Sequence, residues 1–115
     1  MRASAPSSVA VSPLQAAQVY HERLLRHFGA RLREVRLFGS CARGQATEDS
    51  DVDVFVLLRT AGWTDRRDAL DLAGDVWRET GFFVSPLVMT EQLFETWLHQ
   101  DRPLVRDIIR EGLPL

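Results

Sequence analysis

The chain has 115 residues with a formal net charge of −2, and its single cysteine is Cys41. This length is that of one domain, which is long enough to bury a core without covalent staples. One cysteine excludes an internal disulfide and fits a reducing, cytoplasmic location. The charge excludes a general basic field for nucleic acid, and no apolar run approaches membrane-spanning length. We therefore expect neither direct nucleic-acid binding nor membrane insertion.

Residues 1–12 predict a disordered tail, followed by a single domain over residues 13–115. The tail is rich in Ala, Ser and Pro and shows no periodicity. Ser12 and Pro13 then predict a helix N-cap followed by proline at the first helical position. Gly29 can end this helix, whose apolar residues recur at helical spacing: Leu14, Ala17, Tyr20 or His21, Leu24 and Phe28. His21 and His27 have no metal-ligand grouping nearby, so we interpret both as packed or surface residues.

The next stretch combines a glycine turn with two acidic residues. The run from Val35 to Phe38 predicts a buried strand, and Gly39 lets the backbone turn and approach a ligand closely. Ser40 is expected at a helix N-cap, where free backbone N–H groups and the helix dipole favour an anion.

Asp51 and Asp53 lie two positions apart at the start of a second expected strand, which runs to about Leu58. Both carboxylates are expected on one face, with Cα atoms about 6.6 Å apart, a spacing that can reach around a pair of metal ions. A phosphate cradle facing a carboxylate pair indicates chemistry on a nucleoside triphosphate.

The motif as a whole consists of Gly39-Ser40-x-Ala42-Arg43-Gly44 followed by Ser50-Asp51-x-Asp53. It resembles the signature of the minimal nucleotidyltransferases, which are small members of the DNA polymerase β-like superfamily. It fixes eight residues across fifteen positions. The resemblance implies an α/β fold in which a short mixed β-sheet has helices packed mainly on one face. It also implies a nucleotide site at the strand ends.

The resemblance further implies an enzyme that moves a nucleoside monophosphate from a triphosphate, with ATP as the expected substrate, to a hydroxyl. Gly39 and Ser40 would hold the phosphates with support from Arg43, and Asp51 and Asp53 would bind Mg²⁺. Members of this size are often encoded beside a HEPN-domain ribonuclease, for which they act as antitoxin. A HEPN-domain protein is therefore the expected partner. Cys41 occupies the variable position of the motif, and we interpret it as a small packed side chain.

Downstream, Thr64 is expected to cap a helix that runs to about Glu79 and ends at Gly81. Its expected buried stripe consists of Leu70, Ala73, Val76 and Trp77. Residues 82–88 predict a third strand, which Pro86 restricts to a sheet edge or a bulge because proline donates no hydrogen bond. Thr90 then starts a helix with Phe94, Trp97 and Leu98 on one face. Pro103 starts the last helix, which Gly112 stops. One apolar side of this last helix is a candidate contact for a partner or a second copy: Leu104, Val105, Ile108 and Ile109.

One departure from the family pattern concerns the catalytic acids. Active members usually carry a third carboxylate on the strand beside the Asp-x-Asp strand, but here that strand offers Ser85. Glu91 is expected instead in the first turn of the following helix. Three functions therefore compete: an enzyme that modifies a protein partner, a degenerate module that neutralises a partner by binding alone, and a small-molecule transferase of the aminoglycoside-modifying type. The last ranks lowest because it usually needs a further domain to hold its acceptor. A tyrosine acceptor would suit the incomplete acid set, since a phenol with a pKa near 10 is far more acidic than a sugar hydroxyl.

Overall fold

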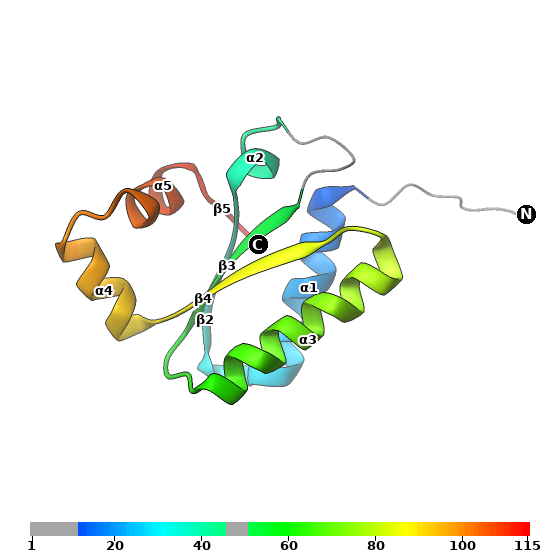
Figure 1. The fold of residues 1–115 in the computed structure, drawn as a ribbon, viewed down its shortest axis with the longest axis horizontal. Coiled ribbons are helices and arrows are strands. Elements are labelled where there is room, and N and C mark those ends of the chain that lie inside the picture. Colours follow the sequence, from blue (N-terminus) through cyan, green and yellow to red (C-terminus); the bar gives the residue numbers. More distant parts are fainter. Residues whose placement is uncertain (1–11, 46–50) are drawn as a thin grey trace, which may run out of the picture.

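The structure, a computed structural model, describes residues 12–45 and 51–115, so all of the expected tail except Ser12 lies outside it. A four-stranded sheet forms the centre of the molecule, and the helices pack on it (Figure 1). In chain order the elements are α1 (Pro13–Phe28), η1 (Gly29–Arg31), β2 (Leu32–Phe38), α2 (Gly39–Ala42), β3 (Val52–Leu58), α3 (Trp63–Thr80), β4 (Val84–Thr90), α4 (Glu91–His99), α5 (Pro103–Glu111) and β5 (Leu113–Pro114).

The sheet is mixed, with the strand order β4-β3-β2-β5. β2 is antiparallel to β3 and pairs Phe38 with Asp53, and it is also antiparallel to β5. β3 and β4 are parallel, with α3 as the crossover between them, and their register pairs Asp53 with Ser85. The expected mixed α/β sheet is therefore confirmed.

Residues of β3 alternate between two separate parts of the core. Val52, Val54, Val56 and Leu58 pack with the longest helices, α1 and α3, while Phe55 and Leu57 pack with α5 and α4 on the opposite face. Most of the core thus lies under α1 and α3, but the second face is covered too. We expected helices mainly on one face, and the packing of α4 and α5 on the second face was not part of that expectation.

The helix α1 begins as its sequence predicts. The Ser12 hydroxyl accepts a hydrogen bond from the Gln15 N–H at 3.1 Å, and the Gln15 side chain accepts one from the Ser12 N–H at 2.8 Å. The fully buried Tyr20 donates its hydroxyl to the Ala69 carbonyl of α3 at 2.8 Å, which joins the two helices. Leu14, expected on the buried stripe, is exposed in the first turn.

Two expectations about α3 are wrong. The helix begins at Trp63, after Gly62 as N-cap, and not after Thr64; the Gly62 N–H donates to the Asp65 carboxylate at 3.0 Å. Its buried face consists of Ala69, Ala73 and Val76, whereas Leu70 and Trp77 are 58% and 52% exposed. Each of these two lies one position after a core residue, which turns its side chain about 100° away from the core.

The strand β4 starts two residues later than expected and forms one edge of the sheet. Its place at the edge confirms the interpretation of Pro86. The Thr90 hydroxyl caps α4 by accepting from the Leu93 N–H at 3.1 Å, and Glu91 lies in the first turn, as expected. The two-residue strand β5 was not predicted, because two residues are too short to show a period.

The C-terminal helix α5 divides its apolar side between core and solvent. Val105 and Ile108 are buried against Phe55 of β3, while Leu104 and Ile109 remain exposed. Within the described residues, no helix is long and apolar enough to cross a membrane.

Candidate functional site

The turn after β2 packs directly against an acidic side chain. Gly39 has a φ of +73°, a conformation that residues with a side chain rarely adopt. A Cβ added there would collide with Oδ2 of Asp53 and would lie 3.2 Å from its Cγ. Glycine at this position therefore allows both the sharp turn and the close approach of the backbone to Asp53.

The position of Ser40 corrects one expectation. The short helical turn α2 takes Phe38 as its N-cap, so Ser40 lies inside the first turn and is not the cap. The extended conformation ends at Phe38, with a φ of −137°, and the helical turn starts at the next residue. Ser40 still lies in the turn that follows Gly39, and its carbonyl accepts from the Gln45 N–H at 2.9 Å.

Asp53 and Asp51 lie close enough to interact electrostatically at the start of β3. Asp53 is in the strand and half-buried, whereas Asp51 is exposed and precedes the first strand residue by one position. Burial raises the pKa of the Asp53 carboxyl, the negative charge of Asp51 raises it further, and the positive charge of Arg43 opposes both. The structure thus brings together the two predicted acids.

Cys41 connects α2 to the same strand. Its thiol donates to the backbone carbonyl of Asp51 at 3.5 Å, and the side chain packs against the core under α1 and α3. Burial raises the pKa of this thiol, and the charges of Asp53 and Asp51 add to the effect. A neutral, packed thiol agrees with our interpretation of Cys41 as a structural residue.

Arg43 extends from the end of α2 toward the C-terminal helix. Its Nη1 lies 3.4 Å from Oε1 of Glu111, and its Nε donates to the Gln45 side chain at 3.2 Å. Its positive charge also lowers the pKa of the Asp53 carboxyl, against the larger rise caused by burial and by Asp51. Arg43 is therefore positioned between the acidic pair and α5.

A pocket of about 200 Å³ lies between the glycine turn and α5. It is lined by Phe38, Gly39, Arg43, Leu104, Asp107 and Glu111. Asp107 and Glu111 did not enter the predicted site. Their four-residue spacing puts them on one side of a helix, but only the return of the chain through β5 to β2 places that helix beside the turn.

The strand next to Asp53 offers no third acid. Ser85 is the register partner of Asp53, and the strand carries no acid, as the sequence predicted. Glu91 lies six residues after Ser85, just past the opposite end of β4, where its carboxylate is 3.4 Å from Arg33. Within residues 12–45 and 51–115, no group of three or more His, Cys, Asp or Glu side chains could hold a metal ion.

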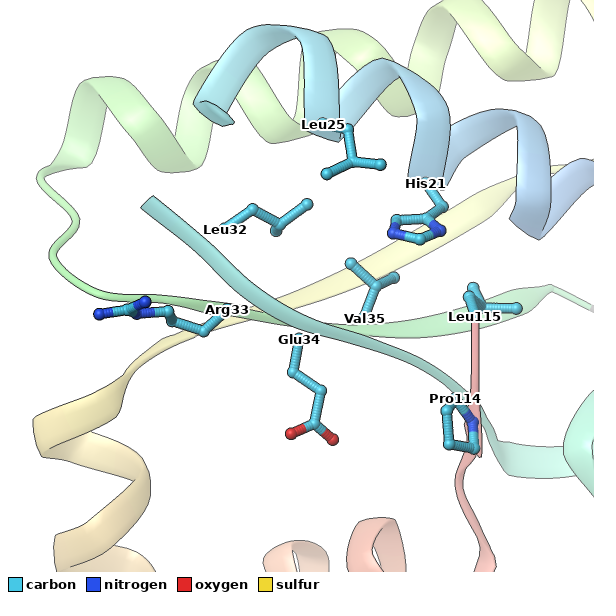
Figure 2. A pocket seen from close by; sticks show the side chains of 8 residues that line it. All are labelled: His21, Leu25, Leu32, Arg33, Glu34, Val35, Pro114 and Leu115. Carbon is cyan, nitrogen blue, oxygen red and sulfur yellow. The ribbon is translucent and has the colours of Figure 1, made fainter. Parts of the chain in front are cut away.

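A second pocket, of about 210 Å³, contains none of the predicted site residues. It lies between α1 and the outer edge of β2, where Figure 2 shows His21, Leu25 and Leu32 around one space. His21 is thus a lining residue, and the His27 Nε2 lies 3.0 Å from the Asp68 carboxylate of α3. Among the described residues, neither histidine belongs to a metal-ligand grouping.

The structure thus combines a mixed sheet with a glycine turn that packs against a strand-borne aspartate. Residues 20–110 match the family model described as "Nucleotidyltransferase domain". The chain therefore belongs to the nucleotidyltransferase domain family and is a nucleotidyltransferase enzyme.

Individual relatives agree with this assignment. A protein of Methanocaldococcus jannaschii named "Putative protein adenylyltransferase MJ0604" is 28% identical over 98 residues, which cover 85% of this chain and 92% of that protein. A solved structure described as "Structure of putative minimal nucleotidyltransferase" is 27% identical, with a TM-score of 0.59, and the match covers 95% of this chain and 99% of that one.

The fold also recurs in more distant structures. One described as "Crystal structure of the toxin-antitoxin with AMP-PNP" has a TM-score of 0.55 at 21% identity, and the match covers 83% of this chain and 68% of that chain. At this identity the likeness shows the fold alone. The expected minimal nucleotidyltransferase fold is therefore confirmed.

Proposed function

We propose that this nucleotidyltransferase transfers AMP from ATP to a tyrosine hydroxyl of a protein partner, and that Gly39, Ser40, Arg43, Asp51 and Asp53 form its active site. Gly39 and Ser40 hold the phosphates of ATP through the backbone of the turn, and Arg43 contributes positive charge beside them. Transfer of this kind depends mainly on positioning and on the stabilisation of charge, which these groups supply.

The metal expected for this chemistry fits the donor set. Asp51 and Asp53 are hard carboxylate ligands, the type that Mg²⁺ prefers. Burial raises the pKa of the Asp53 carboxyl and the negative charge of Asp51 raises it further, so a cation beside the two carboxylates would relieve that repulsion. When bound, Mg²⁺ neutralises charge on the phosphates and orients the leaving pyrophosphate. Asp51 and Asp53 would hold it, and Gly39 lets the backbone of the turn approach Asp53, because a Cβ at this position would collide with that carboxylate.

The observation that carries the choice of acceptor is the pairing of Asp53 with Ser85. A sugar hydroxyl is a very weak acid, and the transfer of AMP to it benefits strongly from a nearby carboxylate base. A tyrosine phenol has a pKa near 10 and needs less help to become a nucleophile. A site with a serine at the third position therefore suits a phenol better than a sugar.

The protein partner we propose is a toxin, with a HEPN-domain ribonuclease as the specific candidate. Two relatives support this direction: the M. jannaschii protein is named as a protein adenylyltransferase, and one structure of the same fold is of a toxin–antitoxin with AMP-PNP, an ATP analogue. A partner surface also supplies the positioning that a transfer between two macromolecules requires. The exposed Leu104 and Ile109 of α5, near the pocket, are candidate contacts.

Intact-mass spectrometry tests the proposal. The proposed partner, a HEPN-domain toxin, is purified and incubated with this protein, ATP and Mg²⁺, and we expect a mass gain of one AMP that maps to a tyrosine. The matched control is the double variant Asp51→Asn with Asp53→Asn, which keeps the size of both side chains and should give no gain. A mass gain on a serine or threonine would contradict the choice of tyrosine.

Neutralisation by binding alone is the second candidate, and the same residue, Ser85, is the observation that favours it. If this candidate is right, the toxin keeps its mass and the double asparagine variant still neutralises it. If AMP transfer is right, the double variant still binds the toxin but no longer neutralises it. The two functions therefore give opposite results in one growth assay.

A further inference from the structure

Three large apolar side chains form an exposed row along α3. Trp63, Leu70 and Trp77 are 71%, 58% and 52% exposed, and each lies seven residues from the next. Seven residues are nearly two helical turns, so the three side chains lie on one side of the helix. Phe83 continues the row, with its ring centroid 5.8 Å from that of Trp77. We call these four residues the α3 row.

The α3 row lies on the flank of α3 that faces away from α1. The opposite flank contacts α1 and η1 through ion pairs of Arg23 with Glu79, His27 with Asp68, and Arg31 with Asp65. α3 runs beside the edge strand β4 (Figure 1), and the row reaches this strand through Phe83, which contacts Trp77 and directly precedes the first residue of β4. The row therefore borders a free edge of the sheet, not a part of the core.

The edge of β4 is itself protected from pairing with another strand. Pro86 has no N–H to donate, and the Val88 carbonyl accepts a hydrogen bond from Arg66 Nη1 at 2.8 Å. A partner at this edge therefore contacts the apolar side chains of the row and does not add a strand.

We infer that the α3 row binds a second copy of this chain, with the two α3 helices antiparallel. The row is symmetric about Leu70, because Trp63 precedes it by seven residues and Trp77 follows it by seven. A two-fold axis at Leu70 places Trp63 of each copy on Trp77 of the other and Leu70 on Leu70. This is the self-complementarity that a two-fold interface between identical chains requires.

The charges beside the row agree with this arrangement. Arg67 lies three residues before Leu70 and Asp71 one residue after it, on the solvent side of the row. In the antiparallel pair, Arg67 of one copy and Asp71 of the other differ in height along the helix by only about 3 Å, so opposite charges meet twice across the axis.

The inference is independent of the proposed function. Asp53 shares its face of the sheet with Phe55, whose neighbours are α4 and α5, whereas α3 packs on the other face. The pocket beside α5 thus stays open when two copies associate through α3.

Sedimentation velocity over a range of protein concentrations gives the first test. We expect a dimer at micromolar concentration, and Leu70→Arg should weaken it at least about 100-fold, since two like charges would meet on the axis. Leu14→Arg, on an exposed side chain of α1, is the matched control and should leave the dimer intact. A wild-type chain that stays monomeric up to about 1 mM overturns the inference and leaves the row to a different protein.

Disulfide crosslinking tests the antiparallel register. In a Cys41→Ser background, Leu70→Cys should crosslink to itself. Trp77→Cys should not, because its two copies would lie about 21 Å apart along the helices, far beyond disulfide reach. A mixture of Trp63→Cys and Trp77→Cys chains should crosslink only between the two variants. Equal self-crosslinking of Leu70→Cys and Trp77→Cys would indicate parallel helices and contradict the inference.

Discussion

Gly39 meets two separate requirements at one position. Its φ of +73° disfavours any side chain, and the Asp53 carboxylate occupies the place where a Cβ would lie. A larger residue would therefore have to shift either the turn or the aspartate, and both belong to the proposed site. Ser40, one residue later, contributes a hydroxyl, and removal of that hydroxyl would cause no steric clash.

This contrast predicts the order of two substitutions. Gly39→Val should abolish ATP binding, because the branched side chain collides with Asp53 and is strained at positive φ. Ser40→Ala should weaken binding by less than about tenfold, since it removes one hydroxyl hydrogen bond and leaves the backbone donors. Calorimetric titration with ATP measures both, and thermal melts check that each variant is folded. A stronger effect of Ser40→Ala would show that the turn is not the phosphate site.

The two acids predict a dependence on divalent metal. Asp51 and Asp53 repel each other, so ATP alone should bind poorly, and Mg²⁺ should increase ATP affinity by at least about tenfold, or 1.4 kcal/mol. Asp51→Ala and Asp53→Ala should each remove this increase. Titrations with Mg²⁺ and with excess EDTA measure it, and equal ATP affinity with and without Mg²⁺ in wild type and in both variants would contradict the metal assignment.

At the scale of the element, α3 has three distinct sides. Small residues on one side pack into the core, acidic residues on a second side bind α1 and η1, and the α3 row lies on a third. The second side also fixes the start of the helix. Asp65 accepts from the Gly62 N–H and from both terminal nitrogens of Arg31, at 3.0–3.2 Å.

These bonds predict how stability depends on pH. The Arg31 guanidinium, together with the Gly62 N–H, lowers the pKa of Asp65 below its usual value. The folded protein thus favours the ionised carboxylate, and the resulting stability is present above about pH 4 and is lost as the pH falls through the lowered pKa.

Substitution of Asp65 isolates this contribution. Asp65→Ala should lower the free energy of unfolding by about 1 kcal/mol at pH 7, and the difference from wild type should shrink toward zero near pH 2. Urea unfolding at a series of pH values measures it. Glu22→Ala, which removes an exposed acid of α1, is the control with little expected effect. A difference that grows as the pH falls would contradict the assignment.

At the scale of the whole molecule, the site and the α3 row belong to opposite faces of the sheet. β2, α2 and β3 supply the site, and α5 closes its pocket, whereas α3 packs on the other face. We therefore expect Leu70→Arg to separate the two copies without changing ATP affinity, and Asp53→Ala to abolish Mg²⁺-dependent ATP binding without changing the sedimentation coefficient. Sedimentation and calorimetry on both variants measure this. Loss of ATP binding on dissociation would show that the second copy completes the site.

Local signals predicted most of the elements. Ser12 with Pro13, Thr90 and Gly112 each mark a helix boundary through a hydrogen bond or a backbone preference within a few residues. The errors fall where neighbours far along the chain decide. Leu70 and Trp77 are apolar and lie at helical spacing, but the core under α3 accepts the smaller Ala69 and Ala73. The site motif could also be recognised from the order of its residues along the chain. Gly39 and Asp53 come together because β2 and β3 pair at these ends, with Phe38 opposite Asp53.

The sequence by itself determined the family and the mixed α/β class through the resemblance of its motif, and it showed that the strand with Ser85 carries no acid, because motif spacing and strand composition are local properties of the chain. Only the tertiary structure decided that Gly39 lies against Asp53, that Asp107 and Glu111 of α5 border the site, and that the α3 row is exposed. These features depend on which faces of separate elements meet. That choice is made by the packing of the whole core, which no single segment specifies.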